Sequence, residues 1–294
     1  MIQNPSDEAA NIQLELRDRT GVLRYSGSQT IPANAVAAIR PRNLAGVEFA
    51  GSAVVTSDRP IAGTCEINRN NNDMCMSYGA IDQGSNQLFY PDFTDTTNPD
   101  NWRSWLMLQN PSDEPANIQL ELRDRAGVLR YSGSRTIPAN GVAAIRPRNL
   151  AGVEFAGSAV VTSDRPIAGA CEINRNNNDM CMSYSAIDQG SNQLFYPDFT
   201  DTINPDNWRS WLMLQNPADE PANIQLELRD RAGGLLYAGS QTIPANGVAA
   251  IRPRIMAGVE FAGSAVVKSD RPIAGACEIN RNNNNMCMSY KATE

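Results

Sequence analysis

Apolar and polar residues alternate along several short stretches of this chain. Between residues 117 and 123, every second position is Ile or Leu and the positions between them are polar or charged. A period of two predicts a half-buried β-strand with one face in water. The flanking stretches 110–115 and 138–141 are rich in Pro, Asn, Asp, Ser and Gly, which favour turns.

The same rhythm predicts about seven short strands in the middle third of the chain. They span residues 105–108, 117–123, 128–137, 142–145, 155–162, 167–174 and 180–184. Turn signals recur every 8–12 residues or so, and no stretch carries a sustained helical period. This pattern is typical of an antiparallel β-sandwich or barrel, so we expect an all-β fold.

The pattern repeats with a long period. Gln3, Gln109 and Gln215 each begin a Gln-Asn-Pro motif, and they stand 106 residues apart. This period is the size of a whole domain and exceeds the roughly 20–50 residues of a solenoid unit, so each copy can own a core. The predicted modules are repeat 1 at residues 1–83, repeat 2 at 84–189 and repeat 3 at 190–294.

The first copy has no counterpart of residues 85–106, so we expect repeat 1 to be N-terminally truncated. Identical linkers would impose the same rotation at each junction, which predicts an extended array of β-sandwich modules. The alternative is a β-propeller with two blades per repeat, because residues 110–116 resemble residues 162–168.

Composition narrows the function. The 294 residues carry a net charge of −7, which disfavours nucleic-acid partners. The chain contains no histidine, the most frequent general base, and this absence argues against an enzyme. No run of about 18 apolar residues occurs, so no membrane insertion is expected within this chain. The first residues do not form a signal peptide.

Each copy carries two cysteines ten residues apart. A hairpin with a three-residue loop would place Cys171 opposite Cys181, near enough for a disulfide. One pair per module also fits an oxidising compartment. The alternative is two buried, reduced thiols. The predicted pairs are Cys65 with Cys75, Cys171 with Cys181, and Cys277 with Cys287.

Carboxylates cluster in the two linkers between copies. Their oxygen chemistry suits Ca²⁺ better than catalysis, and Ca²⁺ is the one cofactor that the sequence suggests. A solvated turn linker is the alternative. The residues are Asp92, Asp95 and Asp100 in the first linker and Asp198, Asp201 and Asp206 in the second.

Tryptophan occurs only beside these linkers, where Phe and Tyr also gather. Stacking on sugar rings would make this region a ligand-binding surface for glycans, whereas packing at the module junction is the alternative. The residues are Trp102, Trp105, Trp208 and Trp211.

Three motifs carry a family resemblance: Trp105-Leu-Met-Leu-Gln-Asn-Pro111, Gly157-Ser-Ala-Val-Val161 and Ser163-Asp-Arg-Pro-Ile-Ala168. In a near-identical array, they resemble the immunoglobulin-like tandem repeats of bacterial and archaeal surface proteins, such as adhesin extender regions. The resemblance implies an extracellular or cell-surface location, with neighbouring copies or other surface proteins as partners.

We therefore expect a non-enzymatic structural repeat protein of the cell surface, such as a stalk, an adhesin extender, a surface coat or a filament component. The alternative function is a multivalent carbohydrate-binding array. The two differ in the exposure of the tryptophan rings, which would lie open on a flat face in a sugar-binding protein.

Overall fold

The computed structural model describes residues 1–46, 48–69, 74–97, 101–152, 154–175, 180–203, 207–258, 260–281 and 286–292. Most of these residues lie in β-strands, and only three short helices interrupt them. The all-β prediction is therefore confirmed.

Copy 1 contains β1 (Ile2–Gln3), β2 (Ala10–Asp18), β3 (Leu23–Ile31), β4 (Val36–Ala37), α1 (Pro41–Ala45), β5 (Gly51–Ser57), β6 (Ala62–Arg69) and β7 (Met74–Gly79). Copy 2 contains β8 (Ser85–Asp95), β9 (Arg103–Gln109), β10 (Ala116–Asp124), β11 (Leu129–Ile137), β12 (Val142–Ile145), α2 (Pro147–Ala151), β13 (Phe155–Arg175) and β14 (Met180–Ser185). Copy 3 contains β15 (Ser191–Asp201), β16 (Arg209–Gln215), β17 (Ala222–Asp230), β18 (Leu235–Ile243), β19 (Val248–Ile251), α3 (Pro253–Ala257), β20 (Phe261–Arg281) and β21 (Met286–Lys291).

Strand β10 shows why the alternating pattern folds as predicted. Ile118, Leu120 and Leu122 are buried, while the residues between them are exposed or half-buried. The strand pairs antiparallel with β11 on one side and β13 on the other. Its apolar face therefore contributes to the core of copy 2, and its polar face meets solvent.

One long strand organises each of the later copies. Strand β13 pairs with β10 and β8 along its first half and with β9 and β14 along its second half, so a single curled sheet of seven strands surrounds the core. Strand β20 plays the same part in copy 3. The result is two half-barrels, one in each copy.

Copy 1 is built differently. The segment that corresponds to β13 is divided into β5 and β6, which belong to separate sheets of three and four strands. Its core cluster is small, with the buried residues Ile2, Ile12, Ile31 and Ala37. This copy has no strand equivalent to β8 or β15 in the described part of the chain, and its core is correspondingly thinner.

Each short helix follows from local sequence signals. A proline opens the helix, where its missing N–H costs no hydrogen bond, and a glycine with φ near +68° ends it in a left-handed conformation. Among the described residues, no helix is long and apolar enough to cross a membrane.

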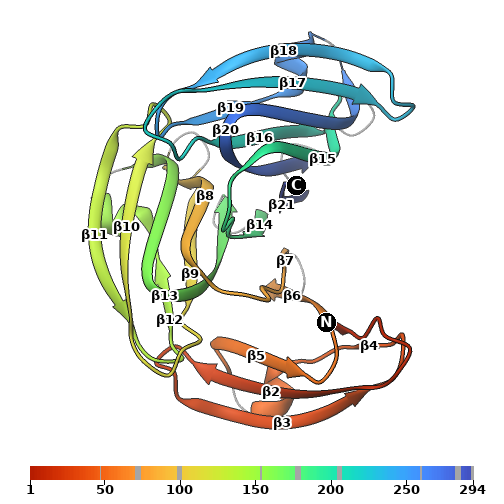
Figure 1. Ribbon diagram of the computed structural model, residues 1–294, viewed down its shortest axis with the longest axis vertical. Helices are drawn as coiled ribbons and strands as arrows, with labels where there is room; N and C mark the ends of the chain where they lie inside the picture. The colour runs from red at the N-terminus through yellow and green to blue at the C-terminus, as the bar shows by residue number, and fades with distance from the viewer. Residues whose placement is uncertain are drawn as a thin grey trace.

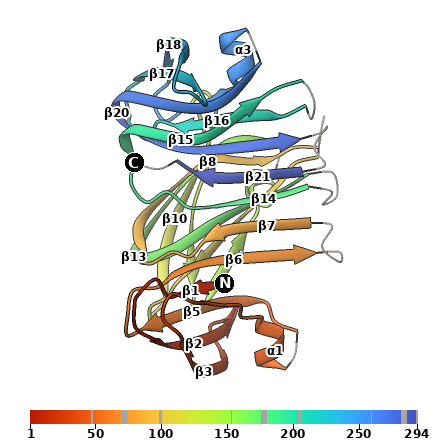
Figure 2. The same ribbon diagram turned by 90° about the vertical axis from the view of Figure 1, so that its right-hand side faces the viewer.

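The three copies curl round a common centre and form an open arc (Figure 1). The strands β7, β14 and β21 face the inside of the arc, and both chain ends lie on its open side. Figure 2 shows β6, β7, β14 and β21 side by side across this inner face. The expected extended array is wrong in this respect, because copies 1 and 3 border the same inner pocket.

The curling is a feature that the propeller alternative shares. In copy 2, the strands on the first half of β13 and those on its second half form two groups joined only by this long strand, and β20 joins two groups in the same way in copy 3, so the propeller alternative stays open. Sequence reasoning missed the curvature because the rotation at each junction depends on contacts between copies.

Candidate functional site

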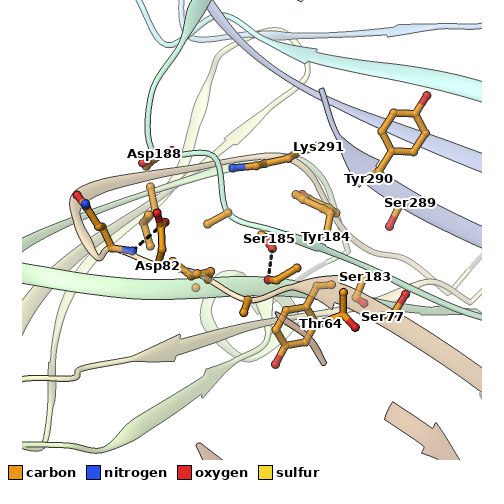
Figure 3. Close-up of a pocket in the computed structure, with 18 residues that line it drawn as sticks. Thr64, Ser77, Asp82, Ser183, Tyr184, Ser185, Asp188, Ser289, Tyr290 and Lys291 are labelled. Carbon is orange, nitrogen blue, oxygen red and sulfur yellow. Dashed lines mark hydrogen bonds between the residues drawn. The ribbon is translucent and has the colours of Figure 1, made fainter. Parts of the chain in front are cut away.

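A pocket of about 380 Å³ lies where the three copies meet inside the arc (Figure 3). Equivalent residues from each copy line it. They are the serines Ser77, Ser183 and Ser289 and the tyrosines Tyr78, Tyr184 and Tyr290. A second cavity beside it is lined by Met76, Met182 and Met288.

The near-identical copies differ inside this pocket. At one equivalent position they carry Gly79, Ser185 and Lys291, and all three residues line the pocket. The Ser185 hydroxyl donates a 2.9 Å hydrogen bond to the Gly79 carbonyl oxygen, which ties copy 2 to copy 1. Because the copies are otherwise nearly identical, the differences at this position could have pointed to the pocket from the sequence alone.

The pocket is lined by hydroxyl groups, carboxylates and one ammonium group. Ser183 is buried, and its hydroxyl has no hydrogen-bond partner among the described residues. A serine hydroxyl needs an adjacent base to become a nucleophile, and the chain has no histidine to supply one. Hydroxyls, the carboxylates of Asp82 and Asp188, and the Lys291 ammonium can instead bind small polar groups.

The prediction that the two cysteines of each copy lie directly opposite each other in the hairpin is wrong. Cys171 pairs across the hairpin with Tyr184, and Cys181 pairs with Asn174. This register is shifted by three residues from the one that a three-residue loop would produce. Because side chains alternate between the faces of a strand, Cys171 and Cys181 lie on opposite faces of the sheet. The same register holds for Cys65 and Cys75 and for the backbone of Cys277 and Cys287.

No disulfide joins the cysteines whose side chains are described; the side chain of Cys287 lies outside the described part. Cys171 and Cys277 are fully buried in the cores of their copies. Burial raises the pKa of both thiols well above the ordinary value, so they behave as small apolar side chains. Each packs beside a tyrosine, Tyr184 or Tyr290, whose pKa is also raised, chiefly by burial.

The linker carboxylates do not gather into one site. Asp95 is fully buried and forms a bidentate ion pair with Arg146, at 2.5 and 2.9 Å, and Asp201 pairs in the same way with Arg252. Asp92 is buried and Asp198 is exposed, each accepting a hydrogen bond from the threonine two residues later. Asp100 and Asp206 lie outside the described residues. The described residues contain no cluster of three or more potential metal ligands.

The tryptophan rings are half-buried and covered. Arg146 lies over the ring of Trp105, with 5.2 Å between its guanidinium carbon and the ring centroid, and Arg252 lies over Trp211 in the same way. Arg281 lies over Trp208, and Trp102 packs against the core of copy 2. A guanidinium therefore occupies a ring face on which a sugar would stack.

Copies 2 and 3 meet through an extended contact between different surfaces. We call the surface of copy 2 the front; it includes Phe89 on β8 and the turn after β10. The surface of copy 3 is the back; it includes Ala274 on β20 and the start of β19. Phe89 and Ala274 share a buried cluster, and the Val248 N–H donates to the Arg125 carbonyl oxygen at 3.0 Å.

The junction between copies 1 and 2 uses the corresponding groups. The Val142 N–H donates to the Arg19 carbonyl oxygen, again at 3.0 Å. The turn glycines approach the next copy so closely that a Cβ on Gly21 or Gly127 would lie 2.1 Å from a carbonyl oxygen. The two junctions thus share the contact made by this turn, whereas, among the described strands, only the second junction includes a strand such as β8.

A carboxyl pair is buried in the second junction. Glu278 of copy 3 faces Asp92 of copy 2, and both side chains are almost inaccessible to solvent. Burial raises the pKa of Glu278 well above its ordinary value, and the nearby Asp92 raises it further. Arg125 acts in the opposite direction. The junction therefore favours a protonated Glu278.

Both ends of the arc leave the same contact surfaces uncovered. In the front of copy 3, Phe195 is 39% exposed, whereas the equivalent Phe89 in the second junction is 6% exposed. In the back of copy 1, Val36 is 55% exposed, whereas the equivalent Val248 is 5% exposed. Gly233, the front glycine of copy 3, has no neighbouring atom where its counterparts meet the next copy.

No protein-family model matches the chain, and no curated protein matches it. No family match therefore supports the resemblance to immunoglobulin-like surface proteins. Among solved structures, Thermotoga maritima 1070 is 15% identical, with 35% of this chain and 94% of that chain covered and a TM-score of 0.30. The Anabaena sensory rhodopsin transducer is 14% identical, with 31% and 97% covered and a TM-score of 0.25. The PBSX exported protein XepA is 8% identical, with 74% and 82% covered and a TM-score of 0.21. Similarities this weak carry no conclusion about function.

Proposed function

We propose that this protein is a non-enzymatic structural repeat protein whose copies assemble through one repeated front-to-back contact, within a chain and between chains. The observation that carries the proposal is the pair of uncovered ends. The front of copy 3 and the back of copy 1 expose Phe195 and Val36, whose equivalents Phe89 and Val248 are buried in the junction between copies 2 and 3.

A contact between two different surfaces continues from copy to copy. Such heterologous contacts produce a ring if the rotation closes and a helical filament if it does not. The back of copy 1 in a second chain would meet the front of copy 3 as the back of copy 3 meets the front of copy 2. We therefore propose a curved assembly in place of the extended array.

The expected cell-surface location stays a prediction, since the register removes the pairing of cysteines within each hairpin on which it partly rested. A glycan-binding array stays the alternative prediction. The arginines that lie over three of the tryptophan rings do not favour it.

Sedimentation velocity over a range of protein concentrations tests the assembly. We expect species larger than the 32.0 kDa monomer. Phe195→Asp and Val36→Asp should each abolish the larger species.

Leu129→Asp is the matched control. Leu129 is exposed to the same extent as Leu23 in copy 1, both at 45%, so its side chain is largely in water. This variant should assemble like the unaltered chain. A purely monomeric chain at every concentration would refute the proposal, as would assembly that survives both end substitutions.

A further inference from the structure

Strand β5 of copy 1 ends its sheet with an open edge. The sheet runs β3-β2-β5, so β5 pairs with β2 alone among the described strands. The equivalent part of β13 in copy 2 pairs with β10 on one side and with β8 on the other. In copy 3, β15 pairs with β20 in the same way.

The missing neighbour leaves apolar side chains uncovered. Ala53 is exposed, and Phe49 and Val55 are only half-buried. Their counterparts in copy 2 are Ala159, Phe155 and Val161, and all three are buried. The sequences of the copies are the same at these positions, so the difference in burial comes from the absent strand.

The missing strand also leaves part of copy 2 less buried than the equivalent part of copy 3. The outer face of β9 and the end of β13 are half-buried at Met107 and Glu172, whereas in copy 3 the equivalent Met213 and Glu278 are buried. In copy 3, strand β8 of the preceding copy covers this surface. A strand added to β5 would therefore face copy 2 as β8 faces copy 3.

Charge and space at this edge fit one particular strand. In copy 2, Asp95 at the end of β8 pairs with Arg146. The corresponding Arg40 of copy 1 is exposed and has no carboxylate partner among the described residues. In copy 2, a Cβ on Gly169 would lie 2.1 Å from the Tyr90 hydroxyl. A Cβ on the corresponding Gly63 would meet Ala80 at 3.1 Å, and the described residues place no tyrosine over it.

We propose that the open edge of β5 is a binding site for an extended peptide strand with the sequence of Ser85–Asp95. Backbone hydrogen bonds along residues 49–56 would hold it, as in other cases of strand addition to a sheet edge. Its tyrosine would lie over Gly63, and its final aspartate would pair with Arg40. This site is separate from the ends that mediate the proposed assembly.

A fluorescently labelled eleven-residue peptide with the sequence Ser85–Asp95 tests the proposal on the full chain. We expect saturable binding by fluorescence anisotropy and slower hydrogen exchange at residues 49–56. A peptide with Tyr90→Asp should not bind. Absence of saturable binding, or protection at a different strand, would overturn the proposal.

Chain variants decide whether the site has the proposed geometry. Arg40→Glu should weaken binding by about tenfold or more, since it replaces an ion pair with two like charges. A peptide with Asp95→Arg should restore the affinity for this variant. Gly63→Ala should weaken binding, whereas Gly79→Ala is the control, because its Cβ would meet no atom within 4 Å. An Arg40→Glu variant that binds as well as the unaltered chain would contradict the proposal.

Discussion

Phe89 is buried in the junction between copies 2 and 3, and the equivalent Phe195 at the end of the arc provides a matched control. Phe89 lies in a buried cluster with Ile187 and Ala274, so Phe89→Ala leaves a cavity that is closed on all sides. Such truncations cost about 3–5 kcal/mol. Phe195 occupies the equivalent strand position in copy 3 but is partly open to water. There the same substitution should cost about 1–2 kcal/mol, in proportion to the apolar surface that it buries.

The assay must resolve the copies, because a chain of several modules need not unfold in one step. Hydrogen exchange followed by mass spectrometry under increasing denaturant reports each copy separately. It should be run at protein concentrations where the chain is monomeric, so that Phe195 is not covered by another chain. Protection around β8 and β20 should fall markedly in Phe89→Ala, and protection around β15 only slightly in Phe195→Ala. Equal losses in the two variants would refute the idea that the next copy buries Phe89.

Two further predictions concern titratable groups. Because the pKa of Glu278 is raised above its unfolded value of 4.5, its contribution to stability is complete below that value and is lost as the pH rises through the folded pKa. Thermal unfolding should therefore show the second junction weakening from acid to neutral pH, and Glu278→Gln should flatten this dependence; parallel profiles for the two proteins would contradict it. In the native protein, Cys171 and Cys277 should react with a thiol reagent far more slowly than the exposed Cys75, and peptide mapping without reduction should find no link between Cys171 and Cys181. Rapid labelling of Cys171, or that link, would show that the register is wrong.

The alternating pattern was sufficient to predict the strands of a single copy. Residues 117–123 became β10 with the expected face buried, because a strand that has one face in the core must alternate. The proline and glycine signals at residues 110–115 and 138–141 marked turns for equally local reasons. Repetition every 106 residues was also visible without any structure.

The hairpin of the cysteines marks where local reasoning fails. Its register depends on which residues the core accepts, and the core takes Cys171 and Ile173 on one face while Asn174 lies on the other. A shift of three residues moves Cys181 to that second face. Spacing in the sequence alone could not distinguish this register from the one with a shorter loop.

The sequence by itself determined the strands, the turns and the repeat, since each depends on neighbouring residues and their periodicity. Only the tertiary structure decided the curvature of the arc, the pairing of Asp95 with Arg146, and the difference between Phe89 and Phe195. These last two residues have nearly the same sequence around them but different surroundings. Burial and charge pairing depend on which distant surface lies against a residue, and no local pattern encodes that surface.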